Sequence, residues 1–253
     1  MTIRSGLLNG VATLEIARPE RKNALTLDMY QALADGLAAA GANPAVRAVL
    51  ITGQPGIFTA GNDLEDFVQR PPQGEDAPVW RFMRALADCE KPVVAAVTGA
   101  AIGIGTTMLL HCDLVYVSDE ARLALPFVGL GLVPEFGASL LLPQRIGAVR
   151  SAEKLLLGDP FTAQEAVELG LCNAVLPPDE VLPHARRMAE RFNALPPSAV
   201  RETKRLLRAP QRATLDAVMA EENALFAARL RGPETQEAIR AFFEKRKPDF
   251  SRF

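Results

Sequence analysis

Hydrophobic residues along the chain fall into two kinds of pattern, and the first kind predicts β-strands. Short, almost continuous apolar runs bounded by glycine, proline or aspartate are typical of buried strands. The first run is interrupted at Asn9 and Gly10, a dipeptide that tolerates the positive φ angles of a type I′ turn, so a β-hairpin is expected to open the fold. Further strands are predicted at residues 48–52, 93–97, 113–117, 122–125 and 174–176.

The second kind of pattern, with apolar residues three or four positions apart, predicts helices between and after these strands. Thr26 is a suitable N-cap for a helix with this spacing, and Thr162 with Glu165 forms a capping box for another helix that ends at Gly170. Further helices are predicted at residues 80–89 and 106–112, from residue 137 onward, and as about four helices between residues 179 and 244.

The order of these elements is strand, strand and helix, repeated over the first part of the chain. This rhythm fits either stacked ββα turns or an α/β sheet, and the pattern alone does not separate the two. From residue 150 onward the chain is mainly helical, with apolar faces too large for these helices to hide from one another. We therefore expect them to dock on the N-terminal part, on another subunit, or on both. Residues 69–78, rich in proline, are predicted to be an exposed, mobile loop and a candidate lid.

Composition narrows the class of protein. The chain has 253 residues, of which 49% are hydrophobic and 23% charged, and its formal net charge is −2. This balance provides no basic field for nucleic acid or an anionic membrane surface, and no apolar run is long enough to span a bilayer. The three cysteines, Cys89, Cys112 and Cys172, have neither a disulfide-framework nor a metal-site spacing. We expect a cytoplasmic protein without a metal ion, whose cysteines are buried.

Two glycine-containing loops precede predicted helices. The sequence GAAIGIG, at residues 99–105, has a GxxxGxG spacing that fits neither a dinucleotide-binding loop nor a P-loop. The second loop contains Gly61, Asn62 and Asp63. Backbone N–H groups at such helix starts can receive negative charge, so both loops are candidates for an oxyanion hole. The alternatives are tight packing of helix on strand for the first loop and a simple N-cap role for Asp63 in the second.

Glu135 is the main candidate for acid–base chemistry. It stands between Pro134 and Phe136 in an apolar stretch, so its carboxylate either turns to solvent or lies in an apolar pocket. In a pocket, desolvation would raise its pKa and make it a proton acceptor and donor near neutral pH. The sequence alone leaves both alternatives open. The two histidines support no Ser-His-Asp or Cys-His arrangement, since His111 is expected in the core or at an interface and His184 at the surface.

Three longer stretches resemble the enoyl-CoA hydratase/isomerase (crotonase) superfamily: FTAGNDLEDF, VTGAAIGIGTTMLLHCDLVYVSDEARLALPFVGLGLVPEFGASLLLP and LLLGDPFTAQEAVELGLCNAVLP. The likeness starts at RPERKNAL and covers most of the chain. It implies an α/β fold, with a crotonase-like spiral of ββα turns over residues 1–195. It further implies a C-terminal helical region, residues 196–253, for trimerisation and active-site cover, in a homotrimer or a dimer of trimers.

The resemblance also implies a coenzyme A thioester as substrate, with no separate cofactor. The backbone N–H groups of Asn62 and Ile104 would hold the thioester carbonyl oxygen. Lys22, or a C-terminal lysine of a neighbouring subunit, would lie near the phosphates of coenzyme A. The residues implied to line the CoA and substrate site are Arg21, Lys22, Ala24, Ala60, Gly61, Asp63, Leu64, Gly103, Pro126 and Leu130.

Two positions depart from the pattern of the hydratases in this superfamily. Thr107 and Phe127 stand where those hydratases carry catalytic glutamates, so the usual pair of carboxylates that activates water is absent. The stretch around Glu135 is most similar to the peroxisomal-type Δ3,Δ2-enoyl-CoA isomerases, in which a glutamate at this place is the only acid/base. The resemblance thus implies an isomerase that converts a 3-enoyl-CoA to a 2-enoyl-CoA, with fatty acyl substrates favoured over the ring compounds of a related group that has aspartate here. A hydratase using Glu135 alone and a non-catalytic CoA-ester-binding protein are the alternatives.

Overall fold

The structure is a computed structural model that describes residues 2–74 and 76–253. Its chain opens with the predicted hairpin, in which β1 (Ile3–Leu8) and β2 (Val11–Ile16) pair antiparallel. Asn9 and Gly10 at its turn have φ angles of 47° and 72°. These left-handed values are the ones that a type I′ turn requires, which confirms the prediction from the sequence.

The strands form two sheets. The larger sheet has the order β1-β2-β3-β5-β7-β10 and is parallel except for the β1–β2 hairpin. In the smaller sheet, of order β4-β6-β8-β9, only β9 runs antiparallel to its neighbour. The bounds are β3 (Ala48–Thr52), β4 (Ile57–Thr59), β5 (Val93–Val97), β6 (Ala100–Ile102), β7 (Leu114–Ser118), β8 (Arg122–Ala124), β9 (Phe161–Thr162) and β10 (Ala174–Leu176).

Consecutive strands alternate between the two sheets. β3, β5 and β7 enter the larger sheet, the strand after each of them enters the smaller sheet, and one or more helices then close the turn. This repeated path is a spiral of ββα turns, so it confirms the predicted crotonase-like α/β fold and resolves the choice that the sequence pattern left open. The three-residue strands β4 and β6 are additions to the prediction.

The helices follow the predicted starts closely. The Thr26 hydroxyl accepts a hydrogen bond from the Met29 N–H at 3.3 Å, and Thr162 accepts one from the Glu165 N–H at 3.2 Å. The α-helices are α1 (Leu27–Ala42), α2 (Leu64–Gln69), α3 (Pro78–Ala87), α4 (Ile104–Thr107), α5 (Ala138–Ile146), α6 (Ala148–Leu156), α7 (Ala163–Glu168), α8 (Pro178–Glu190), α9 (Pro197–Arg208), α10 (Arg212–Leu230) and α11 (Pro233–Phe243). Short 3₁₀ turns lie at η1 (Pro19–Arg21), η2 (Met108–His111), η3 (Val128–Leu130), η4 (Arg191–Ala194) and η5 (Ala209–Gln211).

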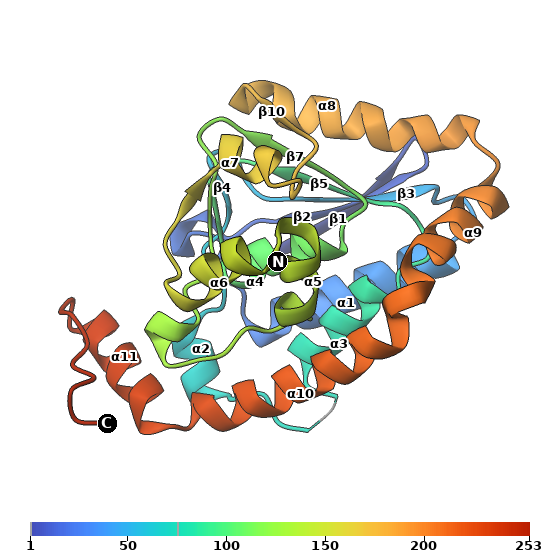
Figure 1. The fold of residues 1–253 in the computed structure, drawn as a ribbon. Coiled ribbons are helices and arrows are strands. Elements are labelled where there is room, and N and C mark those ends of the chain that lie inside the picture. The colour runs from blue at the N-terminus through green and yellow to red at the C-terminus, as the bar shows by residue number, and fades with distance from the viewer. Residues whose placement is uncertain (1, 75) are drawn as a thin grey trace.

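Helices cover both faces of the larger sheet (Figure 1). One face packs against α8, whose buried side chains Val181, Ala185 and Ala189 form a small apolar cluster with residues of β2, β3, β5 and β7. The main core lies on the other face, where it joins the sheets to α1, α3 and α5. Because the central strands are buried on both faces, their sequences are continuous apolar runs rather than alternating ones.

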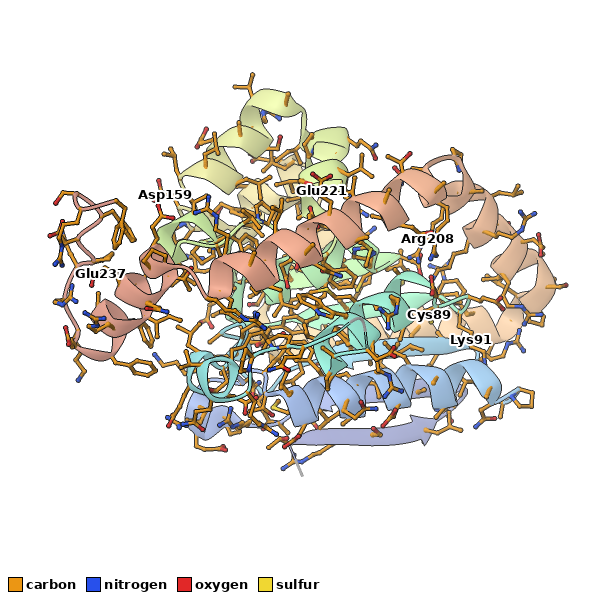
Figure 2. All side chains as sticks on the ribbon, turned by 90° about the horizontal axis from the view of Figure 1, so that it is seen from below. Cys89, Lys91, Asp159, Arg208, Glu221 and Glu237 are labelled. Atoms are coloured by element: carbon orange, nitrogen blue, oxygen red, sulfur yellow. The ribbon has the colours of Figure 1, made fainter. Side chains whose placement is uncertain are left out.

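The C-terminal helices cross the core instead of forming a separate bundle. α10 runs along α3 and leads to α11 at the end of the molecule (Figure 1), and its residues Leu215, Met219 and Phe226 belong to the main core. Arg208, labelled in Figure 2, ties the end of α9 to the core by donating hydrogen bonds to the carbonyl oxygens of Ala87 at 3.1 Å and His111 at 2.7 Å. The four predicted helices are confirmed as α8 to α11, while the division of the chain at residue 195 stays a prediction.

Three local features differ from the expectation. In the loop between α2 and α3, Pro72 and Ala77 are buried because these apolar side chains pack onto the protein, so the loop is exposed only in part, and Glu75 lies outside the described residues. His184 is half-buried, because its ring packs edge-on against Tyr116 with 4.5 Å between the centroids. The predicted helix at 106–112 is a short α4 continued by the 3₁₀ turn η2. Among the described helices, none has the length and hydropathy needed to cross a membrane.

Candidate active site

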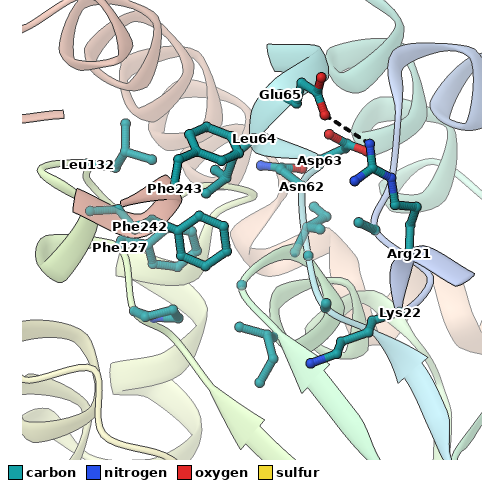
Figure 3. A pocket seen from close by; sticks show the side chains of 18 of the residues that line it. Arg21, Lys22, Asn62, Asp63, Leu64, Glu65, Phe127, Leu132, Phe242 and Phe243 are labelled. Carbon is teal, nitrogen blue, oxygen red and sulfur yellow. Dashed lines mark hydrogen bonds and ion pairs between the residues drawn. The ribbon is translucent and has the colours of Figure 1, made fainter. Parts of the chain in front are cut away.

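A cavity of about 460 Å³ lies where several loops and the C-terminal helices meet. Its wall is built by residues 21–24 and 60–65, the turn into α4, the segment around η3, and aromatic side chains of α10 and α11. Every residue predicted from the sequence for the oxyanion hole or for CoA and substrate binding lines this cavity. Figure 3 shows charged side chains on one side, among them Arg21 and Lys22, and apolar ones such as Phe127, Phe242 and Leu132 on the other.

The first oxyanion candidate, Asn62, follows a glycine with a left-handed backbone. Gly61 has φ +93°, and a Cβ at this position would lie 2.9 Å from the Ile102 carbonyl oxygen, so only glycine fits. The neighbouring N–H groups are occupied, since Gly61 donates to the Thr59 hydroxyl and Asp63 donates to the Leu25 carbonyl. Within the described residues, no partner is found for the N–H of Asn62. That N–H is available to a ligand in the cavity.

The second candidate, Ile104, is the first residue of α4. Gly103 precedes it with φ +57°, which turns the chain from β6 into the helix. The N–H groups of a first helical turn have no acceptor within the helix and carry the positive end of its dipole. Asn62 and Ile104 line the same cavity, which is a requirement for an oxyanion hole built from two loops.

The segment that carries Arg21, Lys22 and Ala24 is held in shape by Asn23. Lys22 and Asn23 both have left-handed backbones, with φ of 52° and 55°. The buried Asn23 side chain accepts from the Arg18 N–H at 2.7 Å and donates to the carbonyl oxygens of Ile57 and Phe58, both at 3.1 Å. Asn23 therefore fixes the turn that presents its neighbours to the cavity.

A nearly buried ion pair joins the two loops at the charged side of the cavity. Arg18 Nη1 lies 2.6 Å from Asp63 Oδ2, and the two side chains are 15% and 9% exposed. Asp63 also accepts from the Asp66 N–H as N-cap of α2, as predicted. Burial raises the pKa of Asp63, but the hydrogen bonds from Arg18 and the Asp66 N–H outweigh it, so the pKa lies below its usual range.

We expect Asp63→Asn to destabilise the protein by about 3 kcal/mol, because Arg18 would remain buried without its anion while asparagine still caps α2. Urea unfolding measures this change. The matched control is Glu65→Gln, which breaks the pair between Arg21 and Glu65, whose side chains are about half exposed. The control should cost less than about 1 kcal/mol. Equal effects of the two substitutions would contradict the structural role assigned to the Arg18–Asp63 pair.

Glu135 is completely buried, on the segment between η3 and α5. Its Oε1 accepts a hydrogen bond from the Thr107 hydroxyl at 2.8 Å, while Oε2 is buried with no hydrogen-bond partner among the described residues. Desolvation raises the pKa of Glu135 to about 8, opposed by the Thr107 hydrogen bond and assisted by the negative charge of Glu222. Of the two alternatives that the sequence allowed, the structure has the buried carboxylate.

Glu135 is not among the residues that line the cavity. The acyl part of a ligand must therefore pass beyond the lining described above to reach Oε2. The two carboxylates of the lining are committed to ion pairs, Asp63 with Arg18 and Glu65 with Arg21. Glu135 is thus the carboxyl group near this cavity that combines an unpartnered oxygen with a pKa close to neutrality.

The structure assigns contacts to the two positions that lack the hydratase glutamates. Thr107 binds Glu135, and Phe127 lines the apolar side of the cavity. Sequence reasoning treated Thr107 only as a missing carboxylate. It also missed Tyr30, whose hydroxyl donates to the Asn62 side chain and whose pKa is raised by burial and by the charge of Glu135. The sequence signal that could have indicated Tyr30 is a hydroxyl-bearing side chain on the buried face of α1.

The described cysteines and His111 are unsuited to nucleophilic catalysis at this site. The three cysteines are free and buried, and desolvation raises the pKa of Cys112 and Cys172 to about 12. Burial lowers the pKa of His111 to about 3, so its ring is neutral. The prediction that His111 and the cysteines belong to the core is confirmed. The features that remain are those for holding and deprotonating a carbonyl compound: a cavity with a charged and an apolar side, two backbone donors and one buried carboxyl.

Comparison with known proteins agrees with this class of site. Residues 7–252 match the enoyl-CoA hydratase/isomerase family model, and the chain belongs to that family. It is 33% identical over 244 residues to the 2,3-dehydroadipyl-CoA hydratase of Escherichia coli, an alignment that covers 95% of this chain and 94% of that protein. It is 35% identical over 245 residues to enoyl-CoA delta isomerase 2 of Rattus norvegicus, covering 94% of this chain and 62% of the relative.

Solved structures show the same fold. OdaA of Pseudomonas aeruginosa has a TM-score of 0.94 and 52% identity, over 95% of this chain and 98% of that one. An enoyl-CoA hydratase/isomerase from Pseudoalteromonas atlantica T6c has a TM-score of 0.95 and 42% identity, over 99% of this chain and 100% of that one. The predicted superfamily is confirmed. Since relatives named as hydratases and as isomerases are about equally similar, the reaction must be argued from the site.

Proposed function

We propose that this protein is a Δ3,Δ2-enoyl-CoA isomerase. The observation that carries the proposal is the buried carboxyl of Glu135, with one oxygen bound to Thr107, one oxygen free and a pKa of about 8. An isomerase needs one group that both removes and returns a proton, and a pKa near the working pH suits both steps. Water addition in the hydratases of this family uses a pair of carboxylates, and Thr107 and Phe127 occupy the places of both.

The cavity suits a coenzyme A thioester. Lys22, for which no ion pair is found among the described residues, supplies a positive charge for phosphate on the charged side. The apolar side, which Phe242 and Phe243 extend from α11, suits the pantetheine arm and the acyl chain. The N–H groups of Asn62 and Ile104 receive the thioester oxygen. Each such donor contributes about 3 to 4 kcal/mol when charge develops on that oxygen.

The proton transfer follows from this arrangement. The ionised Glu135 removes a proton from C2 of a 3-enoyl-CoA, and the electron pair of the broken C–H bond moves toward the thioester, which becomes a dienolate. The two backbone N–H groups hold its negative oxygen. Glu135 then gives the same proton to C4, so that the double bond moves to C2–C3 and the carboxylate is regenerated. Because the surroundings of Glu135 are apolar and poor in water, proton transfer to C4 is favoured over the addition of water.

Product analysis with a panel of 2- and 3-enoyl-CoAs tests the proposal. We expect each 3-enoyl-CoA that is accepted to give the 2-enoyl-CoA, with no 3-hydroxyacyl-CoA formed from either kind of substrate. Chromatography with mass detection separates the two products, because hydration adds the mass of one water. A 3-hydroxyacyl product would make the protein a hydratase that works with one glutamate. Binding without turnover would make it a CoA-ester-binding protein.

A further inference from the structure

The turn that follows Glu135 has an unfavourable backbone. Phe136 has φ +61° and Gly137 has φ +72°, so two consecutive residues are left-handed. Glycine tolerates this conformation, but a phenylalanine does not adopt it without support from the surrounding structure. The position of Glu135 relative to the cavity depends on this turn, because Phe136 is the next residue in the chain. The groups that hold the turn therefore also hold Glu135.

One side of the turn is held by His111. Its Nε2 lies 2.7 Å from the Phe136 carbonyl oxygen, and its ring stacks on the Phe136 ring with 3.9 Å between centroids and 16° between planes. His111 is 3% exposed. Since the ring is neutral and a carbonyl oxygen only accepts, Nε2 must carry the hydrogen and donate it. His111 lies in η2, directly after the helix that carries Thr107.

The other side is held by Glu222 of α10. One of its carboxylate oxygens accepts from the Gly137 N–H at 2.5 Å, and the other accepts from the Ser139 N–H at 2.9 Å and the Ser139 hydroxyl at 2.6 Å. Glu222 is 6% exposed. These bonds satisfy N–H groups at the start of α5 that have no acceptor within the helix.

The two contacts converge on a single peptide group, since the Phe136 carbonyl and the Gly137 N–H belong to the same peptide bond. We propose that His111 and Glu222 are positioning residues that clamp this peptide from both ends, so that Glu135 keeps one oxygen on Thr107 and the other free for the substrate proton. This proposal rests on the proposed function. It makes α10, from the C-terminal region, a necessary part of the active site.

Charges around Glu135 give the clamp a second, measurable effect. Among the described residues, the titratable groups that interact electrostatically with Glu135 are Tyr30 from α1, whose pKa the charge of Glu135 raises, and Glu222 from α10, whose negative charge disfavours ionisation of Glu135. His111 stays neutral. Glu221 acts in turn on Glu222. Removing the charge of Glu222 should therefore allow Glu135 to ionise at lower pH, whereas changing His111 should leave its charge environment unaltered.

The test compares variants that remove one side of the clamp with variants that keep part of it. His111→Phe keeps the stacked ring but removes the donor, and Glu222→Leu removes the acceptor. We expect each to lower kcat by about 10- to 100-fold with KM within about twofold, because a small displacement of the base is costly while the cavity lining is unchanged. His111→Gln restores a donor and Glu222→Gln restores an acceptor, so both should have intermediate kcat values. Glu222→Gln should also move the acidic limb of the kcat–pH profile to lower pH.

Matched controls use residues of the same type outside the clamp. Glu221→Gln changes the exposed neighbour of Glu222. His184→Phe changes a histidine of α8 whose ring packs against Tyr116. Both should leave kcat unchanged. Equal kcat in the clamp variants and the wild type, or losses that only follow the folded fraction measured by circular dichroism, would overturn the proposal. If Glu222→Leu fails to fold, Glu222→Gln with Ser139→Ala carries the same comparison.

A readout without turnover separates this proposal from the proposed function. Infrared difference spectra of each protein against its Glu135→Gln counterpart follow the protonation of Glu135 as the pH is changed. The C=O band of protonated Glu135 in the same spectra reports its hydrogen bond with Thr107. A shifted band in both His111→Phe and Glu222→Gln would support the clamp even if the wild type isomerised nothing, in which case only the proposed function would fail. An unchanged kcat in the clamp variants would overturn the clamp whatever the titration midpoint, and would leave the isomerase assignment standing.

Discussion

Glu135→Gln is expected to abolish the conversion of 3-enoyl-CoA to 2-enoyl-CoA, lowering kcat by about 10³-fold or more. Glutamine has nearly the shape of the carboxyl and can still accept the hydrogen bond that Thr107 donates at 2.8 Å. It cannot take up the C2 proton, and general acid–base catalysis by one group is worth about 10² to 10⁴ in rate. The loss should be near the upper end because the same group acts in both steps. The appearance of the conjugated 2-enoyl thioester by ultraviolet absorbance measures the rate.

Binding of the CoA ester should be almost unchanged in this variant, because Glu135 does not line the cavity. Calorimetric titration with a saturated acyl-CoA, which has no double bond to move, measures that affinity. The matched control is Glu65→Gln, which changes a carboxylate of the cavity lining that is paired with Arg21. It should keep kcat. Undiminished turnover by Glu135→Gln would remove the basis of the isomerase assignment, and a matching loss in Glu65→Gln would move the chemistry to the charged side of the cavity.

The elements that could be predicted from the sequence are those with a local signal. The hairpin turn at Asn9 and Gly10, the Thr26 cap and the buried strand β3 each depend on a few adjacent residues, and the structure has them where they were expected. Strands β4 and β6 have only three residues each and are held by pairing with each other, some forty positions apart. Such short segments gain their conformation from a partner strand, so their own sequence carries no periodicity to detect.

The residues of the site divide in the same way, into those with a local sequence signal and those that depend on contacts with distant parts of the chain. Gly61 and Gly103 could be proposed from residue type alone, since a left-handed turn before a helix needs glycine. The other lining residues that were predicted came from resemblance to a family, which did not indicate Phe226, Phe242 or Phe243. Glu222 could not be found by either means, because it contacts Gly137 from 85 positions away. Its helix was expected to dock on the N-terminal part, on another subunit, or on both, but no residue of it was singled out. Tyr30 lies in the predicted helix that Thr26 caps, but helical spacing does not indicate that its hydroxyl binds the Asn62 side chain.

Burial of an ionisable Glu135 also makes a large prediction for stability: Glu135→Gln should stabilise the protein at alkaline pH by about 3 to 5 kcal/mol. Desolvation raises the pKa of Glu135 from 4.5 to about 8 in the folded protein. Between these pH values the unfolded chain releases the proton and the folded chain keeps it, so unfolding becomes easier as the pH rises. Each pH unit in this window costs the wild type about 1.4 kcal/mol, and above pH 8 the cost is constant.

Urea unfolding of both proteins at pH 4 and pH 9 isolates this effect. At pH 4 the carboxyl is protonated in folded and unfolded chains, and glutamine resembles it in shape and hydrogen bonding, so the two proteins should have similar free energies of unfolding. At pH 9 the variant should be the more stable one. Titrating groups that do not interact with Glu135 act equally in both proteins and cancel in the difference. A difference in free energy of unfolding that did not change between the two pH values would mean that Glu135 ionises as easily in the folded protein as in water, and that its carboxyl is not held in the dry pocket from which its catalytic role was derived.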